Sequence, residues 1–376
     1  MSLKDIAKLL SAPLTPANSV IPKNRRSILI YSNLGLRDNA GSLYDYLISH
    51  GYNSRYRITV GCEDHKELTS SAPENVRFVS PARALFTFLR CGYMFYSFGK
   101  FPVMPAKKQT VVNLWHGMPL KTVGSLEKDR SFDGKCFFTY TIATSPLFEE
   151  IMSKCFCCPR DKVLLTGQPR CDKLFEKNVG KKKLILWLPT YRTSERLRSR
   201  NSQLSGSTGL PTADTAEKLK RLDGLLSELG FKLVIKPHPL QDPSGQLPKF
   251  KNIAFISEKT LRRRKTDIYD LMKMSCALIT DYSSVSFDYL LLDRPIAYTL
   301  DDLDSYSDQR GFTVADPLSL MAGEHITGID GLCGFIRDTA AGKDKYRAER
   351  RELNNIVNSA QDGHSCERIL AECGIE

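Results

Sequence analysis

Apolar segments of strand length alternate with segments of helical spacing along most of this 376-residue chain. Residues 27–35 are an apolar run that ends in a glycine turn, which is typical of a strand. Residues 39–51 follow with helical spacing and end on Gly51, a residue favoured just beyond a helix. Further strands are predicted at residues 56–62, 75–80, 110–117, 139–145, 163–169, 184–192, 231–239, 276–281 and 295–300. The alternation predicts the α/β class, with parallel sheets covered by helices on both faces.

The alternating pattern occurs in two series, which predicts two doubly wound domains. The first is predicted at residues 27–177 and the second at residues 178–350. A lead-in segment rich in proline and basic residues precedes them at residues 1–26, and a helical tail follows at residues 351–376. Doubly wound domains bind ligands at the carboxyl ends of their strands. With two of them in series, we expect the functional site in the cleft between the domains.

Composition limits the compartment and the chemistry of the chain. No run of 18 apolar residues is present, so we expect no transmembrane helix, and the N-terminal segment lacks the apolar core of a signal peptide. The chain is therefore expected in the cytoplasm. Its 11 cysteines are scattered, which favours reduced thiols over disulfides. Cys155, Cys157 and Cys158 lack further ligands at zinc-site spacing, so no metal site is predicted.

The charge balance favours anionic partners. The chain has 54 lysines and arginines against 42 aspartates and glutamates, a formal net charge of +12. Nucleotides, phosphate polymers and the anionic face of a membrane all fit such a charge. No nucleic-acid-binding signature is present, so no nucleic acid partner is expected. The densest basic run, residues 262–265, is either a solvated face or a weak contact to lipid headgroups.

One strand end carries a pattern that suits phosphate binding. The strand at 276–281 ends in Asp281, and Ser283 and Ser284 follow where the next helix is predicted to begin. The first amides of a helix favour an anion, and serine hydroxyls there can cap the helix or reach phosphate oxygens. Capping alone accounts for one serine only. The segment therefore predicts a phosphate site.

Two further strands end in a histidine, one in each predicted domain. His238 lies between two prolines directly after Lys236, so its ring is expected on a rigid loop. His116 is followed by Gly117 and, after a short interval, by Lys121. Either histidine can donate a hydrogen bond to a phosphoryl oxygen or transfer a proton. The two are expected to face each other across the cleft.

Other strand ends add polar side chains. Thr190 and Arg192 follow the strand that begins at residue 184, and Arg170 and Asp172 lie near the predicted domain crossing. Arg310 is a candidate for a bidentate contact to phosphate. The nearby Asp302 and Asp304 fit a solvated acidic loop better than a metal site. The dinucleotide-binding glycine motif, the P-loop and the serine nucleophile elbow are all absent from the sequence.

Taken together, these segments resemble the CDP-glycerol glycerophosphotransferase family, which includes teichoic acid primases and polymerases and capsule relatives. The matching motifs in chain order are WHGMPLK, TGQPRCDKLF, LPTYR, KPHP, LITDYSSVSFDYLLLDRPIAY and RGF. The resemblance extends over roughly residues 28–368. It implies a GT-B fold: two facing Rossmann-like domains, with the nucleotide bound mostly by the C-terminal one.

The resemblance also implies roles for particular residues. His116 resembles the general base that acts on the acceptor hydroxyl, and His238 resembles a partner of the donor phosphates. The implied donor-binding residues are Lys236, Thr190, Arg192, Asp281, Ser283, Ser284 and Arg310. The implied acceptor-side or supporting residues are Gly117, Lys121, Arg170 and Asp172.

The implied activity is transfer of glycerol phosphate from CDP-glycerol to a hydroxyl of a teichoic acid, capsule or lipid-linked glycan acceptor, with release of CMP. No cofactor or metal is expected to be required, because cationic side chains can supply the positive charge. The expected location is peripheral, on the inner face of the cell membrane. Transfer of ribitol phosphate from CDP-ribitol, or of a sugar from a nucleotide sugar by a GT-B glycosyltransferase, remains an alternative. A non-enzymatic binding protein and a membrane-surface scaffold are further alternatives.

Overall fold

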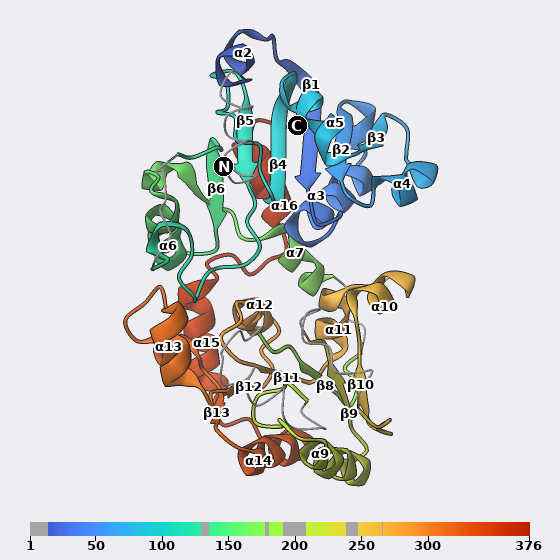
Figure 1. The fold of residues 1–376 in the computed structure, drawn as a ribbon, viewed down its shortest axis with the longest axis vertical. Helices are drawn as coiled ribbons and strands as arrows, with labels where there is room; N and C mark the ends of the chain where they lie inside the picture. The colour runs from blue at the N-terminus through green and yellow to red at the C-terminus, as the bar shows by residue number, and fades with distance from the viewer. Residues whose placement is uncertain (1–13, 129–134, 177–179, 191–207, 238–246, 265) are drawn as a thin grey trace, which may run out of the picture. The chain divides into compact units, whose positions relative to one another are not determined.

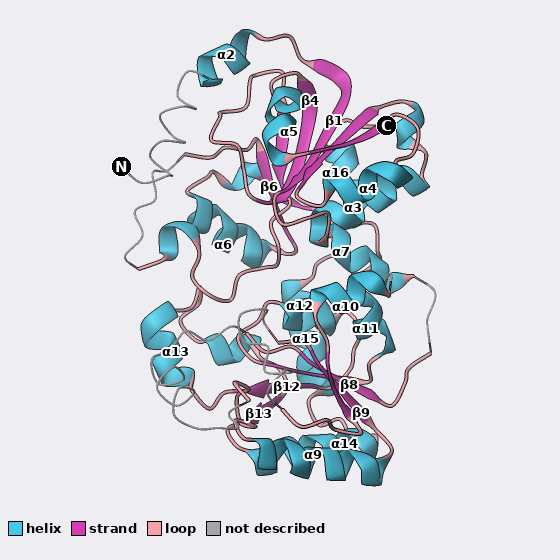
Figure 2. Ribbon diagram, turned by 45° about the vertical axis from the view of Figure 1, so that its right-hand side comes forward, coloured by secondary structure: helices cyan, strands magenta, loops and turns pink. Residues whose placement is uncertain are grey.

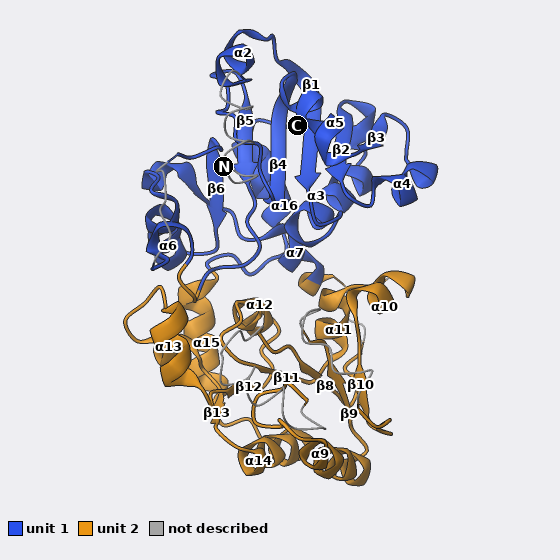
Figure 3. Cartoon of the chain, viewed as in Figure 1, with its two compact units in different colours: residues 1–119, 123–173, 359–376 blue, residues 120–122, 174–358 orange. Residues whose placement is uncertain are grey.

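The computed structural model describes residues 14–128, 135–176, 180–190, 208–237, 247–264 and 266–376. The chain divides into two compact units (Figure 3). Unit 1 consists of Met1–Pro119, Val123–Lys173 and Ser359–Glu376, and unit 2 consists of Leu120–Thr122 and Leu174–Asn358. Each unit is built around its own parallel sheet.

In the described residues of unit 1, seven strands pair in the order β3-β2-β1-β4-β5-β6-β7, all parallel (Figure 1). The strands are β1 (Asn24–Ser32), β2 (Arg57–Cys62), β3 (Val76–Val79), β4 (Cys91–Phe98), β5 (Thr110–Asn113), β6 (Tyr140–Ala143) and β7 (Val163–Leu165). The two central strands, β1 and β4, are long; β4 is almost wholly buried, and β1 is buried from Ser27 onward. Burial on both faces explains their continuous apolar sequences.

Helices cover both faces of this sheet, with α5 on one side and α3 and α16 on the other (Figure 2). The helices of the unit are α2 (Leu14–Val20), α3 (Asp38–Ser49), α4 (His65–Leu68), α5 (Pro81–Phe88), α6 (Pro146–Phe156), α7 (Pro169–Asp172) and α16 (Ser365–Glu372). Helices α5 and α6 begin in the same way, with a serine side chain that accepts an amide hydrogen bond and a proline at the first position. Both features are typical of helix starts.

In the described residues of unit 2, six strands pair in the order β10-β9-β8-β11-β12-β13, again all parallel. The strands are β8 (Leu184–Trp187), β9 (Lys232–Ile235), β10 (Ile253–Phe255), β11 (Ala277–Thr280), β12 (Ile296–Thr299) and β13 (Glu324–Ile326). The helices are α9 (Ala216–Leu229), α10 (Glu258–Arg263), α11 (Ile268–Met274), α12 (Val285–Leu290), α13 (Leu303–Arg310), α14 (Ile329–Ala340) and α15 (Arg347–Val357). Helices α9 and α14 pack on one face of the sheet through their leucine and isoleucine side chains.

The two parallel sheets confirm the predicted α/β class with two doubly wound sheets. Each strand order reverses direction once: between β1 and β4 in unit 1, and between β8 and β11 in unit 2. Such switch points are where open parallel sheets bind ligands. Three strands were not predicted: β4, β10 and β13. The most consequential omission is β4, because it forms one side of the switch point in unit 1.

The chain passes between the units more often than the sequence suggested. Residues 120–122 belong to unit 2, and the residues predicted as one tail are divided, because α15 lies in unit 2 and α16 in unit 1. At the end of α15, the Asn358 side-chain amide donates to the Phe287 carbonyl in unit 2 over 2.9 Å. Part of the predicted lead-in also packs, since the buried Asn18 donates to the Met104 carbonyl over 2.9 Å.

Helix α16 is fixed to unit 1 by a carboxylate and an apolar face. The Asp172 carboxylate accepts from the amides of Ser365 and Cys366, over 2.9 and 2.8 Å. Cys366, Ile369 and Leu370 are buried in the same core as the strands of unit 1. A carboxylate on the first amides of a helix satisfies donors that have no partner within the helix.

None of the helices in the described parts of the chain combines the length and the apolar character needed to cross a membrane.

We predict that Asp172→Ala lowers the free energy of unfolding by about 1–2 kcal/mol, because two amides at the start of α16 lose their acceptor. Urea denaturation, with amide hydrogen exchange of α16 as a local readout, measures the loss. Glu372→Ala, at the other end of the same helix, is the matched control and is expected to leave both readouts unchanged. Equal stability of Asp172→Ala and the parent protein would show that the cap contributes nothing.

Candidate functional site

His116 follows the end of β5 on a turn that is held by two asparagines. The side-chain amide of Asn39, a fully buried residue, donates to the carbonyls of Leu114 and Trp115 over 2.8 and 3.3 Å. The Asn113 side chain accepts from the Trp115 amide over 3.1 Å. Trp115 itself has a positive φ of 52°, a conformation that costs a bulky residue free energy and therefore needs such support. The turn is thus fixed from its strand and from α3.

The ring of His116 lies in an aromatic stack. Its centroid is 4.9 Å from that of Phe98, at the end of β4, with an angle of 23° between the planes. The ring of Trp115 is 4.1 Å away at 33°. These two rings restrict the orientation of the imidazole. A residue that transfers a proton needs such a fixed orientation.

Arg170 and Asp172, predicted as acceptor-side or supporting residues, make internal contacts of unit 1. The buried Arg170 guanidinium donates to both carboxylate oxygens of Asp38, over 3.1 and 2.9 Å. The Arg170 amide donates to the Asn39 side chain over 3.1 Å, and Asp172 caps α16. Arg170 therefore supports the turn that carries His116 indirectly, through Asn39.

The WHGMPLK segment is divided between the units, because Trp115–Pro119 lies in unit 1 and Leu120 and Lys121 lie in unit 2. Gly117 is buried with a φ of 124°, a value that favours glycine. Lys121 belongs to unit 2, where it forms an isolated antiparallel bridge with Phe312. The Thr122 amide donates to the Gly311 carbonyl over 3.2 Å, and its hydroxyl donates to the Arg310 carbonyl. These bonds place Lys121 beside the RGF segment.

At the switch point of unit 2, one carboxylate joins two strand ends. Asp281, fully buried after β11, accepts from the Thr190 amide over 2.8 Å and from the Thr190 hydroxyl. The Thr280 hydroxyl donates to the Leu188 carbonyl over 2.8 Å in the same place. The structure thus brings Thr190 and Asp281 together, and both oxygens of Asp281 hold Thr190 in place.

Ser283 and Ser284 lie in the turn between β11 and α12, and both are partly buried. Ser284 occupies the position before the helix, but its side chain accepts no capping hydrogen bond. Its backbone is helical, with φ −61° and ψ −12°, whereas a capping serine needs an extended backbone. The expected cap from Ser284 is therefore wrong. The Ser283 hydroxyl accepts a long hydrogen bond of 3.5 Å from the Val285 amide.

Lys236, which follows β9, and Tyr282, which follows β11, have charged or aromatic partners within unit 2. The Lys236 ammonium is 3.4 Å from the Glu258 carboxylate. Tyr282 donates to Asp302 over 2.9 Å, and its ring stacks on that of Tyr306 at 4.2 Å. Asp302, assigned to a solvated acidic loop from the sequence, thus accepts a hydrogen bond from a buried tyrosine. Arg310 is the last residue of α13.

Two predicted site residues, His238 and Arg192, lie outside the described residues. Among the residues that are described, no group of three or more histidines, cysteines or carboxylates could hold a metal ion. In the cysteine cluster, burial raises the pKa of Cys155 to about 12 and that of Cys158 to about 11.

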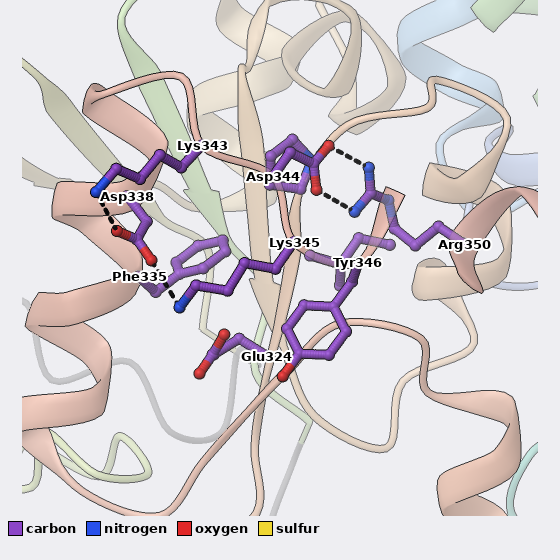
Figure 4. Close-up of a pocket in the computed structure, with 10 residues that line it drawn as sticks. Glu324, Phe335, Asp338, Lys343, Asp344, Lys345, Tyr346 and Arg350 are labelled. Atoms are coloured by element: carbon purple, nitrogen blue, oxygen red, sulfur yellow. Dashed lines mark hydrogen bonds and ion pairs between the residues drawn. The ribbon is translucent and has the colours of Figure 1, made fainter. Parts of the chain in front are cut away.

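A small pocket in unit 2 lies at the opposite end of the sheet, at the starts of β12 and β13 (Figure 4). Its charged groups pair with one another. The Asp338 carboxylate is 2.9 Å from the Lys345 ammonium, and the Asp344 carboxylate is 2.6 Å from the Arg350 guanidinium. These pairs stabilise the connection between α14 and α15 and do not form part of the site.

A family model described as CDP-glycerol:poly(glycerophosphate) glycerophosphotransferase matches residues 14–373. A teichoic acid glycerol-phosphate transferase of Staphylococcus aureus (strain NCTC 8325 / PS 47) is 26% identical over 294 residues, which is 70% of this chain and 70% of the relative. A teichoic acid poly(ribitol-phosphate) polymerase of Bacillus spizizenii (strain ATCC 23059 / NRRL B-14472 / W23) is also 26% identical over 297 residues, which is 72% of this chain but 44% of the polymerase.

Among solved structures, the H548A variant of the wall teichoic acid polymerase TagF superposes with a TM-score of 0.75 at 20% identity, covering 99% of this chain and 93% of that one. At this identity the likeness concerns the fold, and it agrees with the GT-B-like pair of parallel sheets. The family model covers nearly all of the chain, so this protein belongs to the CDP-glycerol:poly(glycerophosphate) glycerophosphotransferase family.

Proposed function

We propose that this enzyme transfers glycerol phosphate from CDP-glycerol to a hydroxyl of a teichoic-acid-type acceptor and releases CMP. The observation that carries the proposal is the grouping, within unit 2, of Lys121 and the RGF segment with the Asp281–Ser284 turn at the switch point. Family membership supports the same donor. We assign the binding of the donor pyrophosphate to these residues of unit 2.

The charge around the turn suits a pyrophosphate. Lys121 interacts electrostatically with the Asp281 carboxylate and with the Arg310 guanidinium, and the oxygens of Asp281 also accept from Thr190. Burial lowers the pKa of Lys121 below its ordinary value, the charge of Asp281 opposes this shift, and Arg310 adds to it. Cationic side chains beside this turn suit the phosphates of the donor.

The proposed reaction is an in-line displacement at the β-phosphorus of CDP-glycerol. The acceptor oxygen forms a bond to this phosphorus while the bond to the bridging oxygen breaks, and CMP leaves with the electron pair. His116 takes the proton of the acceptor hydroxyl. Lys121 and Arg310 stabilise the negative charge that develops on CMP, so the proposal needs no metal or organic cofactor.

Other groups have supporting roles in this proposal. Ser283, Ser284 and Lys236 are assigned to the donor phosphates, as the family resemblance implied. His238 and Arg192 keep their expected donor-side roles, outside the described residues. Gly117 allows the backbone to turn after the base, and Arg170 supports Asn39.

Ribitol phosphate is the second candidate for the transferred group. The ribitol-phosphate polymerase relative is as similar to this chain as the glycerol-phosphate transferase relative, at 26% identity each. Both donors share the cytidine and the pyrophosphate, so the contacts assigned above do not separate them. Only the alditol differs.

Parallel incubation with CDP-glycerol and CDP-ribitol, with CMP release as the readout, tests the donor. We expect faster release from CDP-glycerol, and loss of at least about a hundredfold in turnover for His116→Ala because the base is removed. Faster release from CDP-ribitol would reassign the donor. Release of UDP from a UDP-sugar in place of CMP would reassign the enzyme to sugar transfer.

We predict that Lys121→Gln weakens CDP binding about tenfold, because one charge-assisted contact to the pyrophosphate is lost. Since the pKa of Lys121 is lowered, its ammonium loses its charge at a lower pH than an ordinary lysine, and CDP affinity should fall as the pH rises through that range. Isothermal titration calorimetry against pH measures both effects. Lys121→Arg stays charged at these pH values, so its affinity should stay level; a parallel fall would rule Lys121 out as the titrating group.

We also propose peripheral binding to the inner face of the cell membrane, where a lipid-linked or glycan acceptor would be met. Unit 1 exposes Val20 on α2 and Phe86 on α5, at 79% and 65% of their surface. Arg25 and Arg26, at the start of β1, are also exposed, and Lys23 donates to the Leu89 carbonyl after α5 over 2.6 Å. Apolar side chains among cations favour an anionic lipid surface.

Replacing Val20 and Phe86 together by serine should weaken co-sedimentation with vesicles that contain an anionic phospholipid, by about tenfold. Leu318→Ser, an exposed leucine of unit 2, is the matched control and should sediment like the parent protein. Unchanged sedimentation of the double variant would remove this surface from the proposal.

A further inference from the structure

We propose that Cys136 and Cys158 of unit 1 form a reversible disulfide bond when the protein meets a peroxide, and that this bond slows turnover. Cys136 precedes β6 in the chain, and Cys158 follows α6. The effect on turnover rests on the proposed function, in which His116 is the base. The formation of the bond does not depend on it.

The two thiols interact directly, through a side-chain hydrogen bond and electrostatically. The backbone at Cys158 is fixed, because its amide donates to the Ser153 carbonyl over 3.1 Å and its carbonyl accepts from the Ser153 hydroxyl over 2.6 Å. Cys136 lies in a stretch without helix or strand at residues 135–137. Thiols in contact need little backbone movement to reach the geometry of a disulfide. Closure therefore requires movement mainly on the side of Cys136.

Cys136 is the thiol that reacts with the oxidant. It is partly exposed, whereas Cys158 is buried. Burial raises the pKa of Cys136, and the positive charges of Lys162 and Lys100 oppose this shift. The Lys100 ammonium also lies 4.6 Å from the ring centroid of Phe137, the residue next to Cys136. The thiolate is the reactive form of cysteine, and neighbouring cations favour it.

The oxidation proceeds in two steps. The Cys136 thiolate attacks one oxygen of hydrogen peroxide, the O–O bond breaks, and a sulfenic acid and hydroxide are formed. The Cys158 thiol then attacks the sulfenic sulfur, the S–S bond forms and water leaves. Two thiols and one peroxide thus give one disulfide and two waters, and the two electrons come from the two sulfurs. Cys158 needs no access to solvent, because its target is the sulfur of Cys136.

A purely structural role for these thiols would be to fill space around α6. Cys155, on the same helix, fits that role, because it is fully buried and burial raises its pKa to about 12. Cys136 differs from it in being partly exposed with two lysines nearby. Cys157 is exposed, and its thiol donates to the Lys154 carbonyl over 3.8 Å. It is therefore a matched control for an accessible thiol in the same cluster.

Phe156 connects the thiol pair to the proposed base. Its carbonyl accepts from the Cys136 thiol over 3.3 Å. Its ring lies 4.9 Å from that of Trp115 at 82°, and Trp115 in turn packs against His116. In the disulfide the Cys136 sulfur carries no hydrogen, so the bond to the Phe156 carbonyl is lost and the sulfur is drawn toward Cys158. We expect the Phe156 and Trp115 rings to shift, which disturbs the orientation of His116.

The test treats the full-length protein with hydrogen peroxide, blocks the remaining thiols with an alkylating agent and maps the linked peptides by mass spectrometry. We expect a bond between Cys136 and Cys158. CMP release from CDP-glycerol should fall about tenfold and recover with dithiothreitol, which reverses the bond by thiol–disulfide exchange.

Two variants separate this pair from its neighbour. Cys136→Ser should form no such bond and keep most of its turnover in peroxide. Its hydroxyl can still donate to the Phe156 carbonyl, so its turnover before oxidation should match that of the parent protein. Cys157→Ser should form the bond and lose turnover as the parent protein does.

Tryptophan fluorescence on the same samples gives a readout that does not depend on turnover. Trp115 is one of two tryptophans, and the other, Trp187, lies in unit 2. The emission should change on oxidation of the parent protein and of Cys157→Ser, and stay unchanged in Cys136→Ser.

The inference is overturned if no bond joins Cys136 to Cys158, if Cys157→Ser abolishes the bond, or if the linked protein releases CMP as fast as the reduced protein. If the reduced parent protein releases no CMP from CDP-glycerol, the proposed function fails. The mapped bond and the fluorescence then decide the present inference: both must change in the parent protein and neither in Cys136→Ser.

Discussion

The proposed donor side of this enzyme depends on one buried carboxylate. Asp281 lies at the end of β11 and accepts from both the amide and the hydroxyl of Thr190, at the end of the neighbouring strand β8. Because a buried charge is costly without partners, these two bonds fix the ends of both strands at the point where the strand order reverses. The turn that presents Ser283 and Ser284 starts from this fixed place, and the segment carrying Lys121 joins the same unit beside it.

In unit 1, a side-chain amide holds the turn at the switch point, where unit 2 uses a carboxylate. Asn39, at the start of α3, holds the carbonyls of Leu114 and Trp115 and accepts from the Arg170 amide. The turn that carries His116 is therefore fixed to a helix that is itself held by Arg170. Both switch points are thus held by buried polar side chains, Asp281 in unit 2 and Asn39 in unit 1.

Local patterns predicted much of this arrangement. Alternating strands and helices gave the two parallel sheets, and the positions of strand ends placed Thr190 with Asp281. The strand β4 was missed because its unbroken apolar run follows α5 after a two-residue connection, and a short apolar run does not distinguish strand from helix. Without β4, neither Phe98 nor its contact to the His116 ring could be expected. Lys121 was placed in the wrong unit because its bridge to Phe312 joins residues far apart in the chain. The roles of Asn39 and Asp172 likewise depend on contacts that no local pattern reveals.

The central claim is that the chain moves a phosphate-bearing group by cleaving a pyrophosphate. Phosphorus-31 NMR of CDP-glycerol with the purified protein and a glycerol-phosphate-terminated acceptor follows every phosphorus atom in this reaction. The two pyrophosphate resonances should disappear together, and CMP and a new phosphodiester should appear in equal amounts. An intact pyrophosphate, or free glycerol phosphate formed at the same rate without acceptor, would contradict this claim.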